Sequence, residues 1–167
     1  MEPVLTGETP LVPSLLDRLL DDDPAASREP ASRQAAVVAG IRAGLCRDLR
    51  DLLNAHRFLS AAVERYPEVA SSLANYGLPD LQSLEIREDH DLQSLCRSIA
   101  ETIRRFEPRL VDVRVAPRRE EGGQRSLDRR VRFDIEAVLV VEPLREPVLL
   151  TSALDVNSGE FEVESRR

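Results

Sequence analysis

The chain contains no lysine and no tryptophan, and aromatic residues make up only 4% of its 167 positions. Few aromatic rings argue against a glycosidase, because such enzymes line a sugar cleft with aromatics and hold one carboxyl group in an apolar pocket. Codon bias in a GC-rich genome explains the missing lysines. All 23 basic residues are therefore arginines, whose guanidinium groups form bidentate pairs with carboxylates and suit contacts with protein partners.

The sequence also lacks the patterns of common enzymes and metalloproteins. Its two histidines, His56 and His90, have no cysteine or histidine at metal-ligand spacing. There is no glycine-rich phosphate loop and no nucleophile elbow. Residues 155–159 are similar to the start of a calcium loop, but the remaining ligands are missing, so turn formation explains them better. We therefore expect no catalytic activity, no metal and no cofactor.

Long apolar runs are absent too. No segment approaches the ~18 apolar residues that a membrane helix requires, and no secretory signal is visible at the N-terminus. Cys46 and Cys96 lie on the apolar stripes of expected helices, which favours buried, reduced thiols. The net charge of −7 argues against nucleic-acid binding. These observations favour a cytoplasmic protein with no nucleic-acid partner and no direct insertion into a membrane.

Two regions are expected along the chain. Residues 1–33 form an N-terminal arm, in which residues 14–20 are predicted to be a short amphipathic helix followed by an acidic turn (21–23) and a linker. A helix of about two turns is too short to be stable alone, so it must dock on its own domain or on a partner. Residues 34–167 are expected to fold as a single α+β domain.

Apolar residues at spacings of three and four predict two long helices in this domain. The first covers residues 34–54, with Val38, Ile41, Leu45, Leu49, Leu52 and Leu53 facing the core. The second ends near Phe106, and its stripe consists of Leu92, Leu95, Cys96, Ile99, Ile103 and Phe106.

The C-terminal third predicts an antiparallel sheet of about three to four strands, packed on the helix before it. A first strand has Val111, Val113 and Val115 on its apolar face. Residues 131–141 alternate over a longer strand, residues 150–156 form another, and a hairpin turn at 157–159 leads to the returning strand with Phe161 and Val163. The charge-dense connection 118–130 is expected to be a hairpin tip.

Glu107, Pro108 and Arg109 form the junction between the second long helix and the first strand. Pro108 ends the helix, because proline lacks an amide proton and disfavours helical geometry in the residue before it. Two interpretations remain open. The charges at this corner are either a solvent-exposed pair worth well under ~1 kcal/mol, or a docking site for another chain.

The order of motifs resembles that of TssE, the baseplate subunit of type VI secretion systems, which is similar to the small wedge protein of contractile phage tails. The resemblance covers about residues 13–163. It is carried by Leu15-Leu16-Asp17-Arg18-Leu19, Arg47 to Asn54, Asn75 to Asp80, and Glu107-Pro108-Arg109-Leu110. Relatives of this family have been labelled lysozyme-like, but none of these residues supports that activity.

The resemblance implies a structural role. It implies a subunit that joins the TssF- and TssG-like wedge proteins to the TssB/TssC sheath and helps initiate sheath assembly, with TssK as a further partner, at the cytoplasmic face of the inner membrane. It assigns Glu107, Pro108 and Arg109 to docking on the wedge. It also implies a strand edge that contacts the sheath, for which the candidates are Leu150, Leu154, Phe161 and Val163.

Other functions remain open on the same sequence. The chain fits a wedge subunit of another contractile injection system or of a phage tail, and a stand-alone adaptor protein with the same fold. A glycan hydrolase is the remaining class, which peptidoglycan release by the purified chain would test.

Overall fold

A computed structural model describes residues 11–12, 14–19, 34–57, 66–79, 89–118 and 130–166. Most of the predicted N-terminal arm, including the acidic residues 21–23, lies outside these ranges, as does the tip of the connection at 119–129. Within the arm, α1 covers Leu15–Leu19. The division into an arm and a domain at residue 33 stays a prediction.

Two long helices carry most of the helical core. α2 covers Gln34–Asn54 and α4 covers Asp89–Phe106. Their predicted apolar stripes are buried over most of their length, as in Leu45, Leu49, Ile99 and Ile103. The short helix α3 (Pro67–Ala70) and the 3-10 turn η2 (Leu73–Asn75) lie between them in the sequence.

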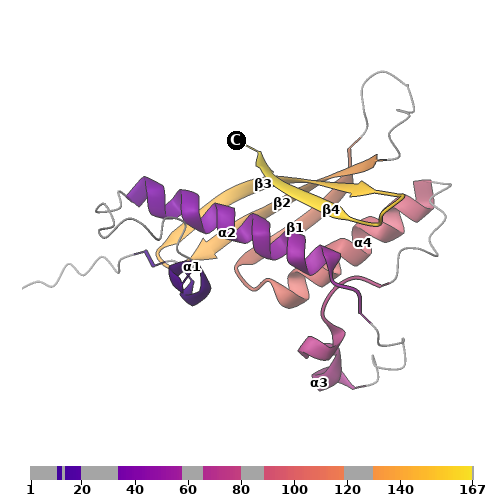
Figure 1. Ribbon diagram of the computed structural model, residues 1–167, viewed down its shortest axis with the longest axis horizontal. Coiled ribbons are helices and arrows are strands. Elements are labelled where there is room, and N and C mark those ends of the chain that lie inside the picture. The colour runs from indigo at the N-terminus through magenta and orange to yellow at the C-terminus, as the bar shows by residue number, and fades with distance from the viewer. Residues whose placement is uncertain are drawn as a thin grey trace, which may run out of the picture.

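Four strands follow α4 and form one antiparallel sheet in the order β1-β2-β3-β4. They are β1 (Leu110–Pro117), β2 (Arg130–Val141), β3 (Leu144–Asp155) and β4 (Phe161–Arg166). In Figure 1 the two long helices lie against this sheet, with α4 along β1 and α2 crossing toward β4. The predicted α+β class, with a helix packed on a C-terminal antiparallel sheet, is confirmed.

The core lies between the helices and one face of the sheet. Alternate residues of the strands point into it because successive side chains of a strand face opposite sides. Helices and strands contribute to a single buried cluster that includes Leu49, Ile103, Phe133, Leu150 and Phe161. Both cysteines are free thiols, Cys96 buried and Cys46 half-buried.

A β-bulge changes which residues of β1 face the core. Val111 pairs with Val138 and Arg114 pairs with Glu136, so three steps on β1 match two on β2. The extra residue is Asp112, which has a φ of 55°. The bulge reverses the side on which the preceding residues lie. Leu110 and Val113 are buried, whereas Val111 lies on the opposite face, so the prediction that Val111 shares a face with Val113 was wrong.

The segment around Gly77 connects the end of α2 to the residues before α4. Leu78 N–H donates to the carbonyl oxygen of Ala55 at 2.9 Å, and Arg57 N–H donates to that of Leu78 at 2.9 Å. Gly77 has a φ of 100°, a conformation that favours glycine. Among the described residues no helix is long and apolar enough to cross a membrane.

Candidate functional site

The corner between α4 and β1 is fixed by main-chain hydrogen bonds. Glu107 N–H donates to the Ile103 carbonyl at 2.8 Å, which closes the last turn of α4. Leu110 N–H then donates to the Glu107 carbonyl at 3.1 Å, and Val140 N–H donates to the Arg109 carbonyl at 2.8 Å. The chain therefore turns and joins β2 within three residues, with Pro108 exposed at the outside of the turn.

The carboxylate of Glu107 and the guanidinium of Arg109 form a bidentate ion pair. Arg109 Nε donates to Glu107 Oε1 at 2.7 Å, and Arg109 Nη2 donates to Glu107 Oε2 at 2.6 Å. The main-chain N–H of Arg109 adds a third contact to Oε1 at 3.2 Å. A bidentate pair of this kind fixes the orientation of the guanidinium as well as its position.

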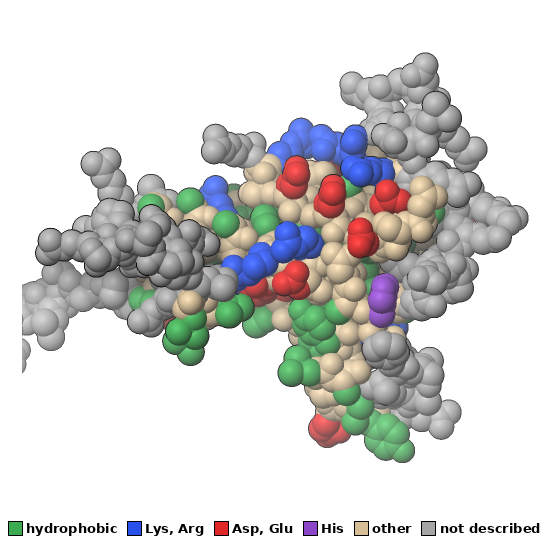
Figure 2. All heavy atoms as spheres, in the orientation of Figure 1, with side chains coloured by type: hydrophobic (Ala, Val, Ile, Leu, Met, Phe, Trp, Pro, Cys, Tyr) green, Lys and Arg blue, Asp and Glu red, His purple; other side chains and the backbone are tan. Residues whose placement is uncertain are grey.

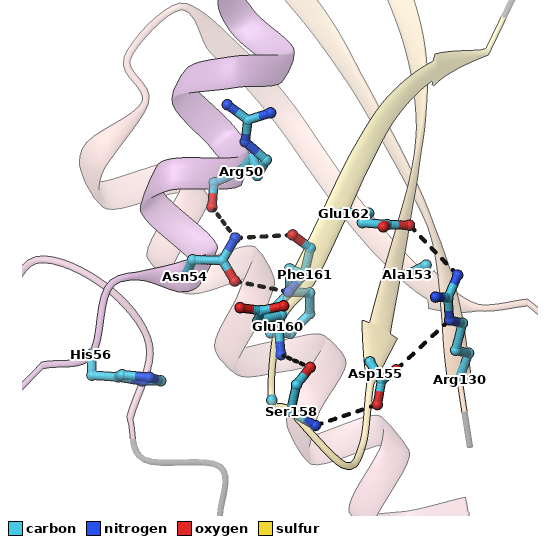
Figure 3. A pocket seen from close by; sticks show the side chains of 11 residues that line it. Arg50, Asn54, His56, Arg130, Ala153, Asp155, Ser158, Glu160, Phe161 and Glu162 are labelled. Atoms are coloured by element: carbon cyan, nitrogen blue, oxygen red, sulfur yellow. Dashed lines mark hydrogen bonds and ion pairs between the residues drawn. The ribbon is translucent and has the colours of Figure 1, made fainter. Parts of the chain in front are cut away.

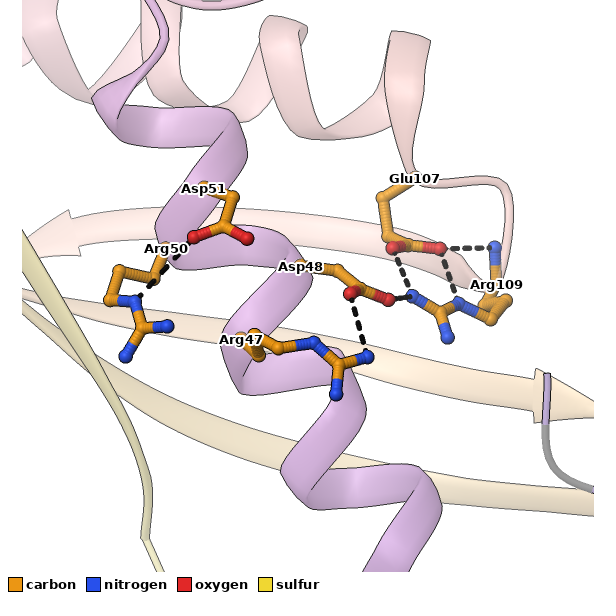
Figure 4. A network of polar contacts seen from close by, with 6 residues as sticks. All are labelled: Arg47, Asp48, Arg50, Asp51, Glu107 and Arg109. Carbon is orange, nitrogen blue, oxygen red and sulfur yellow. Dashed lines mark hydrogen bonds and ion pairs between the residues drawn. The ribbon is translucent and has the colours of Figure 1, made fainter. Parts of the chain in front are cut away.

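A residue of α2 extends this pair into a network, as Figure 4 shows. Arg109 Nη2 also donates to Asp48 Oδ2 at 2.6 Å, and Arg47 Nη2 donates to Asp48 Oδ1 at 3.2 Å. The corner is therefore attached to the middle of α2, 61 residues earlier in the chain.

Burial distinguishes this network from an ordinary surface ion pair. The side chain of Glu107 is only 8% exposed and that of Arg109 is 24% exposed. Hydrogen bonding to Glu107 raises the pKa of Arg109 above its usual value, with a further contribution from Asp48, although burial acts in the opposite direction. The guanidinium is thus held in its charged form between two carboxylates.

Tyr76 lies beside the same acidic groups. Its ring makes an edge-to-face contact with Phe106, with ring centroids 5.3 Å apart. Burial raises the pKa of the Tyr76 hydroxyl, and the negative charges of Asp51, Asp48 and Glu107 raise it further. The phenol therefore stays protonated and neutral beside the carboxylates.

The interpretation of the corner as a solvent-exposed pair is wrong, because Glu107 is buried and holds Arg109 in a bidentate contact. Docking of a partner on this corner stays a prediction. Charge reversal at Glu107 or Arg109 would place like charges together at a buried position, so we expect such variants to lose fold stability as well as binding.

The residues predicted to form a partner-contacting strand edge lie in two different environments. Leu150 and Leu154 are buried in β3, which pairs with β2 on one side and with β4 on the other, so neither lies on an edge. Phe161 and Val163 belong to β4, the last strand of the sheet, but their side chains face the core. The edge that another chain can reach is therefore the backbone of β4, with its main-chain N–H and C=O groups.

Asn54 covers the first part of that edge. Asp155 N–H donates to the Glu160 carbonyl at 2.9 Å, so residues 160, 162 and 164 face β3, and residues 161, 163 and 165 face outward. The side chain of Asn54 satisfies both outward groups of Phe161, because Oδ1 accepts from its N–H at 2.8 Å and Nδ2 donates to its carbonyl at 2.9 Å (Figure 3). The outward groups further along β4 are those of Val163 and Ser165.

The opposite edge of the sheet, formed by β1, is interrupted. It contains the bulge at Asp112, it ends in Pro117, and Arg104 donates to the Val113 carbonyl from α4. Bulges, prolines and covering side chains are the usual devices that stop a strand edge from pairing with another chain. The two edges of this sheet therefore differ in their capacity to accept a strand.

A polar hollow lies beside the start of β4. Its lining includes Arg50, His56 and Arg130, together with acidic side chains from the end of β3, from β4 and from the turn between them (Figure 3). Arg130 is within 3.8 Å of Asp155 and 3.7 Å of Glu162. In the part of the chain that the structure describes, no cluster of His, Cys, Asp and Glu is arranged to hold a metal ion.

Asp48 and Asn54 are the two site residues that sequence reasoning missed. Both lie in the Arg47–Asn54 motif. Their partners are distant in the sequence, and no local pattern specifies them. The signal that was available was the motif itself.

Comparison with known proteins identifies the family of this chain. Residues 39–144, more than half of the chain, match the model of a family described as Baseplate wedge protein gp25. No curated protein and no solved structure matches the chain.

Proposed function

The chain belongs to the Baseplate wedge protein gp25 family, and on this premise we propose that it is the small wedge subunit of a type VI secretion baseplate, similar to TssE. The match includes three of the four motifs on which the resemblance rests, namely those within residues 47–54, 75–80 and 107–110. This observation supports a role as a structural subunit of a contractile tail-like baseplate. We propose that the chain is not an enzyme.

In this proposal the corner docks on the wedge. Pro108 is exposed at the turn, and Arg109 is held from behind by Glu107 and Asp48. Preorganised side chains lose little conformational freedom on binding, so a corner held in this way is suited to a defined contact. The wedge partners are proteins similar to TssF and TssG, and TssK is a further candidate.

The edge of β4 is the proposed contact with the sheath. Its outward groups at Val163 and Ser165 offer main-chain donors and acceptors to an added strand. Exposed glutamates lie along this strand, and Figure 2 shows acidic side chains gathered over it. An added strand with basic side chains would complement them. In this proposal the subunit acts in the cytoplasm, with TssB and TssC as its sheath partners.

Co-expression of the chain with the TssF-like and TssG-like proteins of its own genome tests the wedge assignment. Affinity purification followed by size-exclusion chromatography should give one complex that contains all three proteins. A folded monomer that binds neither protein would overturn the assignment and would favour the stand-alone adaptor.

The sheath contact has a separate test. Ser165→Pro removes an outward N–H of β4 but leaves its hydrogen bonds to β3 in place. We expect this variant to join the wedge complex normally and to lose assembly of TssB/TssC sheath on it. Sheath that assembles at the wild-type level on this variant would argue against β4 as the contact.

One alternative has direct support. The matching family is described as a baseplate wedge protein without reference to secretion, so a subunit of a phage tail or of another contractile injection system fits the same match. The genes beside this one distinguish the two functions. Genes for TssF- and TssG-like proteins support the secretion system, and genes for phage capsid and tail proteins support the alternative.

A further inference from the structure

Residues 66–79, which we call the α3 projection, extend from the body of the protein below α2 in Figure 1. Three large apolar side chains on it are exposed, with relative exposures of 63% for Tyr66, 38% for Val69 and 82% for Leu73. Figure 2 shows apolar side chains at its outer end. These three side chains lie on one short segment. Single apolar residues scattered over a surface need no explanation, but a cluster of them does.

The base of the projection is firmly attached. Leu78 is fully buried and exchanges main-chain hydrogen bonds with the end of α2. The ring of Tyr76 packs against Phe106 of α4. At Gly77 any Cβ atom would collide with Ala55, so the backbone of the projection directly touches that of the residue that follows α2.

The outer part is ordered by its own hydrogen bonds. Asn75 is buried, and its Nδ2 donates to the Ala70 carbonyl at 2.9 Å. Ser72 Oγ donates to the Val69 carbonyl at 2.8 Å, and Ser71 Oγ donates to that of Pro67 at 3.0 Å. The exposed apolar side chains are thus presented by a folded turn, which reduces the entropy lost when they bind a partner.

The chemistry of the projection indicates what it binds. Glu68 is the single charged residue in the sequence from 66 to 79, so a complementary surface is apolar with a basic rim. The hollow beside β4 does not suit it, because polar and charged side chains make up most of its lining. The projection would therefore not bind in this hollow of a second copy, and we take a different protein as its partner.

We propose that the α3 projection inserts Leu73, flanked by Tyr66 and Val69, into an apolar groove with a basic rim on another baseplate wedge subunit. This inference rests on the proposed function, since that function supplies the partner. It adds a second contact, distinct from the corner at Glu107–Arg109. Large apolar and aromatic side chains that become desolvated in a pocket commonly carry most of the binding energy of an interface.

The test is a pull-down of the co-expressed wedge proteins with the wild-type chain, Leu73→Ser, Val69→Ser and Val156→Ser. Val156 is a matched control for Val69 because the two are 40% and 38% exposed, but Val156 lies in the turn between β3 and β4. All three variants should keep the wild-type thermal unfolding curve. We expect Leu73→Ser to weaken capture of the wedge proteins by about tenfold or more, Val69→Ser to weaken it less, and Val156→Ser to retain it. Glu68→Arg should also weaken capture, most strongly at low salt.

The outcomes separate this inference from the proposed function. If the wild-type chain captures no wedge protein, the proposed function fails and the inference fails with it. If the wild-type chain and Leu73→Ser capture equally well, the proposed function stands and the inference is overturned. Equal loss in Val69→Ser and Val156→Ser would also overturn it, because that result would show general adhesion of exposed apolar side chains.

Discussion

At the scale of single residues, two glycines have opposite roles. Gly77 combines a positive φ with direct contact against the Ala55 carbonyl. Gly40 lies on the exposed side of α2, and a Cβ atom there would meet nothing within 4 Å. Glycine is therefore required at one position and is merely tolerated at the other.

Substitution of each glycine by alanine tests this difference. Gly77→Ala should lower the free energy of unfolding by about 3 kcal/mol or more, because both the backbone conformation and the contact with α2 are disturbed. Gly40→Ala should raise it by about 0.5–1 kcal/mol through better helix propensity. Urea unfolding followed by circular dichroism measures both, and equal effects of the two substitutions would contradict the prediction.

At the scale of elements, the network at the corner attaches α2 to the junction of α4 and β1. Arg109→Met leaves the carboxylate of Glu107 buried without its partner, so we expect a loss of about 2–4 kcal/mol in the free energy of unfolding. Asp48→Asn keeps a polar group at a more exposed position and should cost less than about 1 kcal/mol. The same urea titration compares them. Similar costs for the two variants would show that the buried pair is not the main contributor.

The attachment of β4 to α2 depends on Asn54. Asn54→Ala removes both hydrogen bonds to Phe161, and we expect a cost of about 1–2 kcal/mol together with faster hydrogen exchange at the Phe161 amide. Ser165→Ala, at an exposed position of the same strand, serves as the control and should leave that exchange rate unchanged. Unchanged protection of Phe161 in Asn54→Ala would exclude this attachment as a stabilising contact.

Local periodicity was sufficient to predict α2, α4 and most of β2, because apolar residues recur in those segments at periods of 3.6 and 2, which place them on one buried face. It failed at Asp112, where one extra residue in β1 reverses the alternation. It also could not separate edge from interior strands, so Leu150 and Leu154 were assigned to an edge. The pairing of Asp48 with Arg109 depends on a contact between segments 61 residues apart, which no local pattern encodes.

At the scale of the whole molecule, the acidic side chains on β4 bear on self-association. Glu162 and Glu164 are exposed on the strand whose outward backbone groups are available at Val163 and Ser165. Charged residues on an edge strand oppose pairing between two copies of the same edge, because like charges would lie close together.

Removal of these charges should therefore allow the edges to pair. We expect the double variant Glu162→Thr/Glu164→Thr to form dimers or larger species at concentrations at which the wild-type chain is monomeric. Glu101→Thr, an exposed substitution on α4, is the control. Sedimentation velocity measures the distribution of species, and a double variant that stays monomeric like the control would contradict this role of the glutamates.

The unequal edges of the sheet give the molecule a direction. A sheet with two open edges can be extended from either side, and copies of it can polymerise without limit. Here β1 is closed by its bulge, its proline and Arg104, and Asn54 closes β4 up to Phe161. Extension is restricted to one side and to one short stretch of backbone. A chain that adds a strand there would leave the far side of the sheet closed, so, under the proposed function, this sheet would begin a row of subunits and would not lie within one.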